Sequence, residues 1–152
     1  MQIPLNHKTI TVRLKDLAES INELEVLAKL SEEDLIKDHH NFALASFYLL
    51  RSLEDILSIG AHVLSRLFKV TISEKYNDIL PELARSGIIP QEFANRNTKL
   101  GSYRNRLVHD YLKITPEEMF NILQTHLVDL KLFGQIINDL INNPSKFNLK
   151  IE

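Results

Sequence analysis

The sequence of 152 residues contains no cysteine and no tryptophan, and it has only four glycines and five prolines. Without cysteine the chain can form neither a disulfide nor a zinc–thiolate site, which fits a reducing cytoplasm. No apolar run approaches the roughly 18 residues of a membrane-spanning helix. The first ten residues, "MQIPLNHKTI", also lack the apolar segment of a signal peptide. We therefore expect a cytoplasmic protein without membrane association.

An excess of charge of either sign is also missing, because 18 basic residues face 20 acidic ones and the net charge is -2. Any contact with RNA would therefore have to come from a local patch rather than from the whole surface. Hydrophobic residues make up 44% and charged residues 25% of the chain, as in globular domains. The length suits one domain, and we expect residues 1–152 to form it, with residues 143–152 as a terminal tail.

The apolar residues recur at helical spacing, and no stretch alternates as a strand would, so the sequence predicts an all-α protein. A first helix is expected over residues 9–30. Ser31, followed by acidic residues, should cap a second helix that reaches about Phe68, and "DHHN" marks a candidate break within it. The apolar stripe of the first helix contains Leu14, Leu17, Ile21, Leu24 and Leu27.

The second half of the chain carries clear helix boundaries. A third helix, about residues 73–86, should end at Gly87, which suits a left-handed backbone. Pro90 suits the first turn of a fourth helix. Thr115 with Glu118 three residues later forms a capping box for a last helix that reaches about Asn142. These elements predict a compact antiparallel bundle of about five helices.

The segment "YRNRLVHDY", residues 103–111, is too polar for a helix that only packs. Histidine titrates near pH 6.5 and can accept or donate a proton at neutral pH, and arginine binds phosphate oxygens with a permanently charged planar group. Both groups suit cleavage of RNA by its own 2'-hydroxyl, which needs a base, an acid and positive charge at the phosphate. One aspartate beside one histidine is too little for a two-metal site, so we expect no metal.

Spacing within this segment does not by itself define a site. On an ideal helix Arg104 and His109 point about 140° apart. Either the helix ends near His109, or a second copy of the chain presents the same residues across a two-fold axis. Spacing alone favours a structural role, with Arg104 and Arg106 in surface ion pairs and His109 capping a helix end.

The segment nevertheless resembles the R-x-x-x-x-H-x-Y motif of the HepT-like toxins, within the HEPN superfamily. Asn105 directly follows the motif arginine, Val108 precedes the histidine, and Tyr111 lies two residues after it. The stretch "LARSGIIPQEFANRNTKLGS" before the motif and "ITPEEMF" after it also resemble the family. The match extends from the second helix to the last.

The resemblance implies a HEPN-like helical fold and a dimeric, metal-independent endoribonuclease. Such a protein is the toxin of a module whose antitoxin is an MntA-like nucleotidyltransferase. Arg104 and His109 would be the catalytic pair, and Asn105 would orient the site. Two motifs meeting across the dimer would supply two histidines, one as base and one as acid. Tyr111 would be the residue to which the antitoxin attaches adenylate.

The resemblance implies no cofactor, and the RNA could be tRNA or mRNA. It also leaves a different class of function open. HEPN domains occur as non-catalytic partners that dock a nucleotidyltransferase or bind its nucleotide. The intact motif favours the enzyme, because a scaffold need not keep both groups.

Further candidates are individually weaker. Arg106 could bind substrate phosphate or be a solvated surface arginine. Arg51 and Asp55 are four residues apart on the second helix, where they could pair with each other or, together with Glu54, support the motif. The remaining assignments are structural. Tyr103 is expected in the core rather than as a base-stacking platform, and His39 and His40 should not bind metal because their side chains point apart. The sequence shows no partner for three other histidines, His7, His62 and His126.

Overall fold

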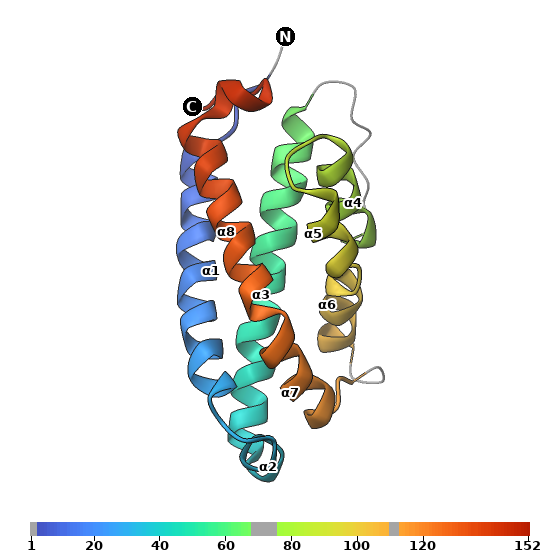
Figure 1. Cartoon of the computed structure of the whole chain (residues 1–152). Helices are drawn as coiled ribbons and strands as arrows, with labels where there is room; N and C mark the ends of the chain where they lie inside the picture. The colour runs from blue at the N-terminus through green and yellow to red at the C-terminus, as the bar shows by residue number, and fades with distance from the viewer. Residues whose placement is uncertain (1–2, 68–75, 110–112) are drawn as a thin grey trace.

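The structure is a computed structural model that describes residues 3–67, 76–109 and 113–152. Within these residues every regular element is helical, and the only extended pairing is an isolated bridge between Leu5 and Ile151. The predicted all-α class is therefore confirmed. Figure 1 shows the helices side by side as a bundle, with both termini at the same end.

The first half of the chain folds as two long helices joined by a short one. They are α1 (His7–Ala28), α2 (Glu32–Lys37) and α3 (His39–Arg66). The Ser31 hydroxyl accepts from the backbone N–H of Asp34 at 3.1 Å, as its capping role predicted. The break expected near "DHHN" is at Asp38, whose carboxylate caps α3 by accepting from the N–H of His40 at 2.8 Å.

Three short helices then lie along the side of α3 that faces away from α1 (Figure 1). They are α4 (Tyr76–Arg85), α5 (Gln91–Arg96) and α6 (Leu100–Val108). The expected left-handed residue after α4 is present, with a φ of 78° at Gly87. Residues 73–75, where we expected the third helix to begin, lie outside the described residues.

Two helices that the sequence predicted as continuous are each divided. The fourth predicted helix separates into α5 and α6 at Asn97. The buried side-chain amide of Asn97 donates to the Phe93 carbonyl at 2.8 Å, which is the carbonyl that the backbone N–H of Asn97 would use if the helix continued. The last predicted helix separates into α7 (Pro116–Thr125) and α8 (Leu127–Asn142) at His126. The side chains of Asn97 and His126 contact each other, so both breaks are at one tertiary contact.

The C-terminal residues are packed rather than forming the tail that we expected. After α8 the chain makes a 3-10 helix, η2 (Pro144–Phe147), and Leu149 is buried. The N–H of Leu5 then donates to the Lys150 carbonyl at 2.7 Å, and the N–H of Glu152 donates to the Leu5 carbonyl at 2.9 Å. The two ends of the chain therefore hold each other in place.

Two glycines allow α4 to approach its neighbours closely. A Cβ at Gly101 in α6 would lie 2.4 Å from Oδ1 of Asn77 and 2.9 Å from its backbone nitrogen. A Cβ at Gly60 in α3 would lie 2.5 Å from Cγ2 of Ile79. All three distances are shorter than real contacts of this kind, and the contact at Gly101 includes the backbone of α4, so α4 can occupy its position only because Gly101 lacks a side chain. Among the described helices, none is both long enough and apolar enough to cross a bilayer.

Candidate active site

Helix α6 ends between the two motif residues. Its last residue is Val108, and His109 follows with an extended backbone, φ -106° and ψ 115°. Arg104 is therefore on the helix and the exposed His109 is beyond its end. Of the two arrangements considered for the 140° separation on an ideal helix, the structure shows that the helix stops before the histidine.

Arg104 is held by residues from two other helices. Its Nε donates to Oε1 of Glu54 in α3 at 2.5 Å, and its guanidinium carbon lies 4.2 Å from the centroid of the Tyr76 ring in α4. The side chain is only 19% exposed. A guanidinium with a carboxylate on one edge and an aromatic face beneath it has little rotational freedom.

Asn105 contacts both motif residues. Its side-chain oxygen accepts from Nη1 of Arg104 at 3.3 Å, and its backbone carbonyl accepts from the N–H of His109 at 3.0 Å. These two contacts are the geometric basis for the orienting role that the resemblance implied for Asn105.

Arg106 joins α6 to the start of α7. Its Nη1 and Nη2 donate to the two carboxylate oxygens of Glu118 at 2.7 and 2.6 Å, and Nη2 also donates to the Lys113 carbonyl at 3.3 Å. This hydrogen bonding lowers the pKa of Glu118. A bidentate pair of this kind is directional. It fits a structural role for Arg106, which joins the end of α6 to Lys113 and to the first turn of α7. Thr115 also caps α7 as predicted, because its hydroxyl accepts from the N–H of Glu118 at 3.2 Å.

Of the polar residues on α3, Glu54 rather than Arg51 or Asp55 contacts the motif. Arg51 forms an ion pair with Asp16 of α1, and Asp55 accepts from Nη1 of Arg13, also of α1, at 3.2 Å. Adjacent helical residues point 100° apart. Glu54 therefore faces α6 while Asp55 faces α1.

Asp55 is a buried carboxylate with few donors. The residue is 2% exposed, and Oδ2 has no hydrogen-bond partner among the described residues. Burial raises the pKa of Asp55 despite the hydrogen bond from Arg13, because removing a carboxylate from water disfavours its charged form. The hydrogen bond between Asp55 and Arg13 joins α3 to α1. It lies on a different side of α3 from the motif.

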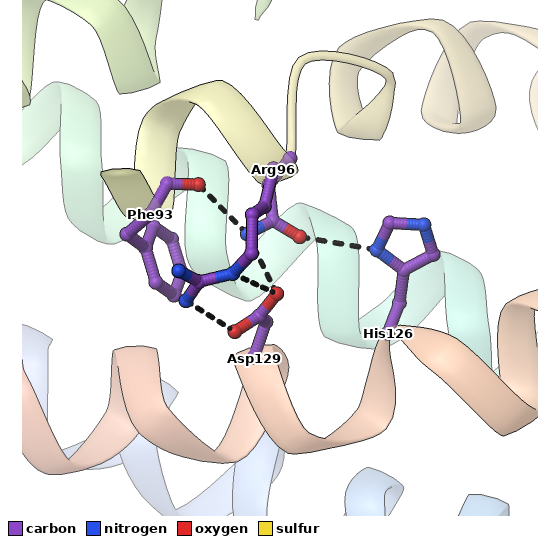
Figure 2. Close-up of polar contacts among 5 residues, drawn as sticks. Phe93, Arg96, His126 and Asp129 are labelled. Carbon is purple, nitrogen blue, oxygen red and sulfur yellow. Dashed lines mark hydrogen bonds and ion pairs between the residues drawn. The ribbon is translucent and has the colours of Figure 1, made fainter. Parts of the chain in front are cut away.

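A second polar cluster, which the sequence did not predict, joins the end of α5 to α8 (Figure 2). Arg96 donates from Nη2 to Asp129 Oδ1 at 2.9 Å and from Nε to Oδ2 at 3.3 Å, and the amide of Asn97 also donates to Oδ2 at 3.0 Å. Burial alone would raise the pKa of Asp129, but the hydrogen bonds from Arg96 and Asn97 outweigh it and the pKa is lowered.

His126 extends this cluster to the motif helix. Its Nδ1 lies 3.1 Å from Oδ1 of Asn97, and its ring meets the ring of Tyr103 edge to face with centroids 5.9 Å apart. Burial lowers the pKa of His126. The sequence offered no partner for His126 because Asn97 is 29 residues away. Tyr103 is buried, as expected for a core residue.

Two further predictions concern residues near the motif. Tyr111, the predicted modification site, lies outside the described residues. Within the part of the chain that the structure describes, no three or more histidine, aspartate or glutamate side chains gather as potential metal ligands.

Comparison with known proteins identifies the family of this chain. A family model described as "Ribonuclease HepT-like" matches residues 17–137, which include α3, the motif and α7. The chain belongs to the HepT-like ribonuclease family. The resemblance found in the motif is thereby confirmed.

Individual HepT relatives are distant but extensive. The tRNA nuclease HepT of Aphanizomenon flos-aquae is 25% identical over 132 residues, or 87% of this HepT-like chain and 89% of that relative. The mRNA nuclease HepT of Shewanella oneidensis is 28% identical over 89 residues, or 59% and 66% of the two chains.

A solved structure confirms the fold. The tri-AMPylated HEPN toxin of Shewanella oneidensis, in complex with an MNT antitoxin, has a TM-score of 0.75 to this chain at 21% identity. The similarity covers 86% of this chain and 97% of that toxin. The HepT-like chain therefore has the fold of a HEPN toxin.

Proposed function

We propose that this HepT-like protein is a metal-independent endoribonuclease, the toxin of a module whose antitoxin is an MntA-type nucleotidyltransferase. The observation that carries the proposal is the placement of Arg104 and His109 on either side of the end of α6. The names of the two relatives, a tRNA nuclease and an mRNA nuclease, support RNA as the substrate class. Because such a toxin acts on cellular RNA, we place it in the cytoplasm.

The proposed chemistry uses the RNA's own 2'-hydroxyl. A base removes the 2'-hydroxyl proton, the 2'-oxygen attacks phosphorus, and the bond from phosphorus to the 5'-oxygen breaks as an acid protonates that oxygen. The products are a 2',3'-cyclic phosphate and a 5'-hydroxyl. His109 supplies the proton-transfer group, and Arg104 stabilises the charge that develops on the phosphate oxygens. No step needs a metal ion.

One chain supplies one motif histidine, whereas the reaction needs a base and an acid together. A second copy facing the first would supply the other His109. The face around the motif supports such a contact, because Leu44 and Phe47 of α3 and Val108 of α6 are 47%, 53% and 44% exposed. Leu44, Phe47 and Glu54 lie three and seven residues apart and thus along one side of α3. Exposed apolar side chains in this number next to a site favour a protein contact.

The supporting residues differ in how directly their contacts reach the site. Asn105 supports the site directly through its contacts with Arg104 and His109. Arg106 supports it by fixing the start of α7 through Glu118. Arg51 and Asp55 act at a distance, because their ion pairs with Asp16 and Arg13 fix α3 on α1.

The deciding experiment incubates purified protein with total tRNA, and separately with an mRNA, in the presence of EDTA. We expect cleavage that leaves a 2',3'-cyclic phosphate or a 3'-phosphate. Loss of a proton-transfer group costs about 10²- to 10⁴-fold, so His109→Ala should reduce cleavage by that factor. His7→Ala, which changes an exposed histidine of α1, is the matched control.

Two outcomes would contradict the proposal. Loss of cleavage on chelation that magnesium restores would exclude the metal-independent mechanism. A folded wild-type protein that binds the nucleotidyltransferase but cuts no RNA would instead support the non-catalytic docking function.

We further propose that adenylylation of Tyr111 silences the toxin. The tri-AMPylated state of the Shewanella toxin supports this class of modification. Adenylate adds a phosphodiester charge that competes for the motif arginine, and its purine would block the RNA. Co-expression with an MntA-type nucleotidyltransferase should add adenylate mass to the wild type and not to Tyr111→Phe. A silenced wild type without added mass would mean that the antitoxin inhibits by docking.

A further inference from the structure

Three helices together determine the direction of the Arg104 side chain. The arginine is on α6, Glu54 Oε1 of α3 accepts from its Nε at 2.5 Å, and the Tyr76 ring of α4 lies 4.2 Å from its guanidinium carbon. Asn105 accepts from Nη1 at 3.3 Å. With 19% of the side chain exposed, the guanidinium cannot swing outward without losing these contacts.

The contacts occupy one part of the guanidinium and leave another part available. The group carries five N–H bonds, one on Nε and two on each terminal nitrogen. Glu54 takes the bond on Nε, and Asn105 takes one of the two on Nη1. Among the residues that the structure describes, three of the four N–H bonds on Nη1 and Nη2 have no acceptor, and a phosphate needs only two parallel bonds to be bound in a bidentate manner. Glu54 therefore orients the guanidinium without using the edge that phosphate would need.

The position of Tyr76 depends on Gly101, which is one helical turn before Arg104. A Cβ at Gly101 would lie 3.0 Å from the carbonyl carbon of Tyr76 and 2.9 Å from the nitrogen of Asn77. The backbone at the start of α4 thus rests directly on α6. This close approach brings the Tyr76 ring to the guanidinium rather than to solvent.

We propose that Glu54 and Tyr76 are positioning residues that fix the Arg104 guanidinium for a phosphate group of the RNA. The inference rests on the proposed role of Arg104 in cleavage. Free arginine side chains have many rotamers, and holding a group in its working geometry before the reaction removes that entropic cost from the rate-limiting step. An arginine already held in place stabilises transition-state charge without reorganisation.

The opposite role for Glu54 is inhibition, in which its carboxylate neutralises Arg104 until RNA displaces it. The geometry favours positioning, because Glu54 bonds to Nε and is itself 36% exposed, so that water screens its charge. The two roles predict opposite signs when Glu54 is removed: positioning predicts slower cleavage, and inhibition predicts faster cleavage.

The experiment measures cleavage rates of Glu54→Ala, Glu54→Gln, Tyr76→Phe and Tyr76→Leu with total tRNA, together with thermal stability. Misplacement of a catalytic group costs up to about 100-fold, so we expect Glu54→Ala to lower kcat by about 10- to 100-fold with KM little changed. Glu54→Gln should recover much of the rate, because its amide oxygen can still accept from Nε. Tyr76→Phe should behave as the wild type, whereas Tyr76→Leu, which lacks the aromatic face, should be slow.

A second background separates positioning from a general structural effect. In Arg104→Lys no Nε–H remains for Glu54 to hold, so adding Glu54→Ala should slow this variant far less than it slows the wild type. The matched control is Glu25→Ala, which breaks the Lys131–Glu25 ion pair between α8 and α1. Its kcat should equal that of the wild type.

Three outcomes would overturn the inference: Glu54→Ala as fast as Glu25→Ala, Glu54→Ala faster than the wild type, or an equal slowing by Glu54→Ala in the Arg104→Lys background. An Arg104→Ala control separates this failure from that of the proposed function. If Arg104→Ala cleaves like the wild type, the proposed function is wrong. If Arg104→Ala is inactive and Glu54→Ala is fully active, only the positioning role is wrong.

Discussion

Replacing Gly101 with alanine should loosen the contact between α4 and α6 on which the site depends. The new Cβ would lie 2.4 Å from Oδ1 and 2.9 Å from the nitrogen of Asn77, and 3.0 Å from the carbonyl carbon of Tyr76. Two of these three atoms belong to the backbone. The start of α4 must therefore move as a unit, and Tyr76 moves with it.

The magnitude follows from two opposing effects. Inserting a methyl group into a packed contact typically costs about 1–3 kcal/mol. Replacing glycine by alanine in a helix returns at most about 1 kcal/mol. We expect Gly101→Ala to lower the free energy of unfolding by about 1–2 kcal/mol, because the atoms it meets are rigid. In a domain of this size that corresponds to a fall in Tm of about 2–8 °C.

Two other helical glycines make the test internally controlled. At Gly134 in α8 the nearest atom to a new Cβ is Cδ2 of Leu17 at 3.7 Å, an ordinary contact, so Gly134→Ala should stabilise the protein by about 0.5–1 kcal/mol. At Gly60 the close atoms are the methyl groups of Ile79 and Leu83, which can rotate away, so Gly60→Ala should fall between the other two.

Urea unfolding and tRNA cleavage, measured on all three variants, test this order. Only Gly101→Ala should also lose cleavage activity, because only that substitution moves Tyr76 away from Arg104. A Gly101→Ala protein as stable as Gly134→Ala would refute the close approach of α4 to α6, and with it the packing that holds the site.

Further predictions concern the dimer, the catalytic pair and pH. Phe47→Glu should give a monomer by light scattering and stop cleavage, whereas Val26→Glu, at a somewhat more exposed position of α1, should leave the dimer intact. The double variant Arg104→Ala/His109→Ala should cleave little more slowly than either single variant, because the effects of groups that act in one step do not add. Additive losses of rate would contradict a shared transition state. Burial lowers the pKa of both His62 and His126, so their contribution to stability is complete above about pH 6.5 and is lost as the pH falls through the folded pKa. The pH dependence between 7 and 5 should therefore be weaker in His62→Gln and His126→Gln, and unchanged curves in both would show that neither histidine titrates differently on folding.

Helix ends that depend on local chemistry were predictable from the sequence. Ser31, Gly87 and Thr115 each mark an observed boundary, because a capping hydroxyl or a left-handed glycine acts within three or four residues. The boundaries at Asn97 and His126 were not predictable. These two side chains end their helices by contacting each other across 29 residues, and helical periodicity carries no information on such a contact.

The residues of the site also include some that the sequence predicted and some that it could not predict. The motif residues were recognisable from their pattern, and the cap at Thr115 already indicated a helix end near His109. Which residue of α3 would contact the motif was not predictable. Glu54 and Asp55 are adjacent and equally charged, and only the packed positions of α1 and α6 determine that Glu54 contacts Arg104 while Asp55 contacts Arg13.

The motif helix is too short to set its own position. An isolated helix of nine residues is marginal in water, and α6 has nine. Besides the contacts of Arg104 itself, three further contacts set the position of α6. Gly101 receives the start of α4, the buried Tyr103 ring rests against His126, and Arg106 binds Glu118 of α7. These contacts occupy residues 101, 103 and 106, and Arg104 and Asn105 lie between them. Arg104 and Asn105 are thus held by neighbours that need not touch RNA, so a change in any of the three contacts should affect cleavage through the position of Arg104.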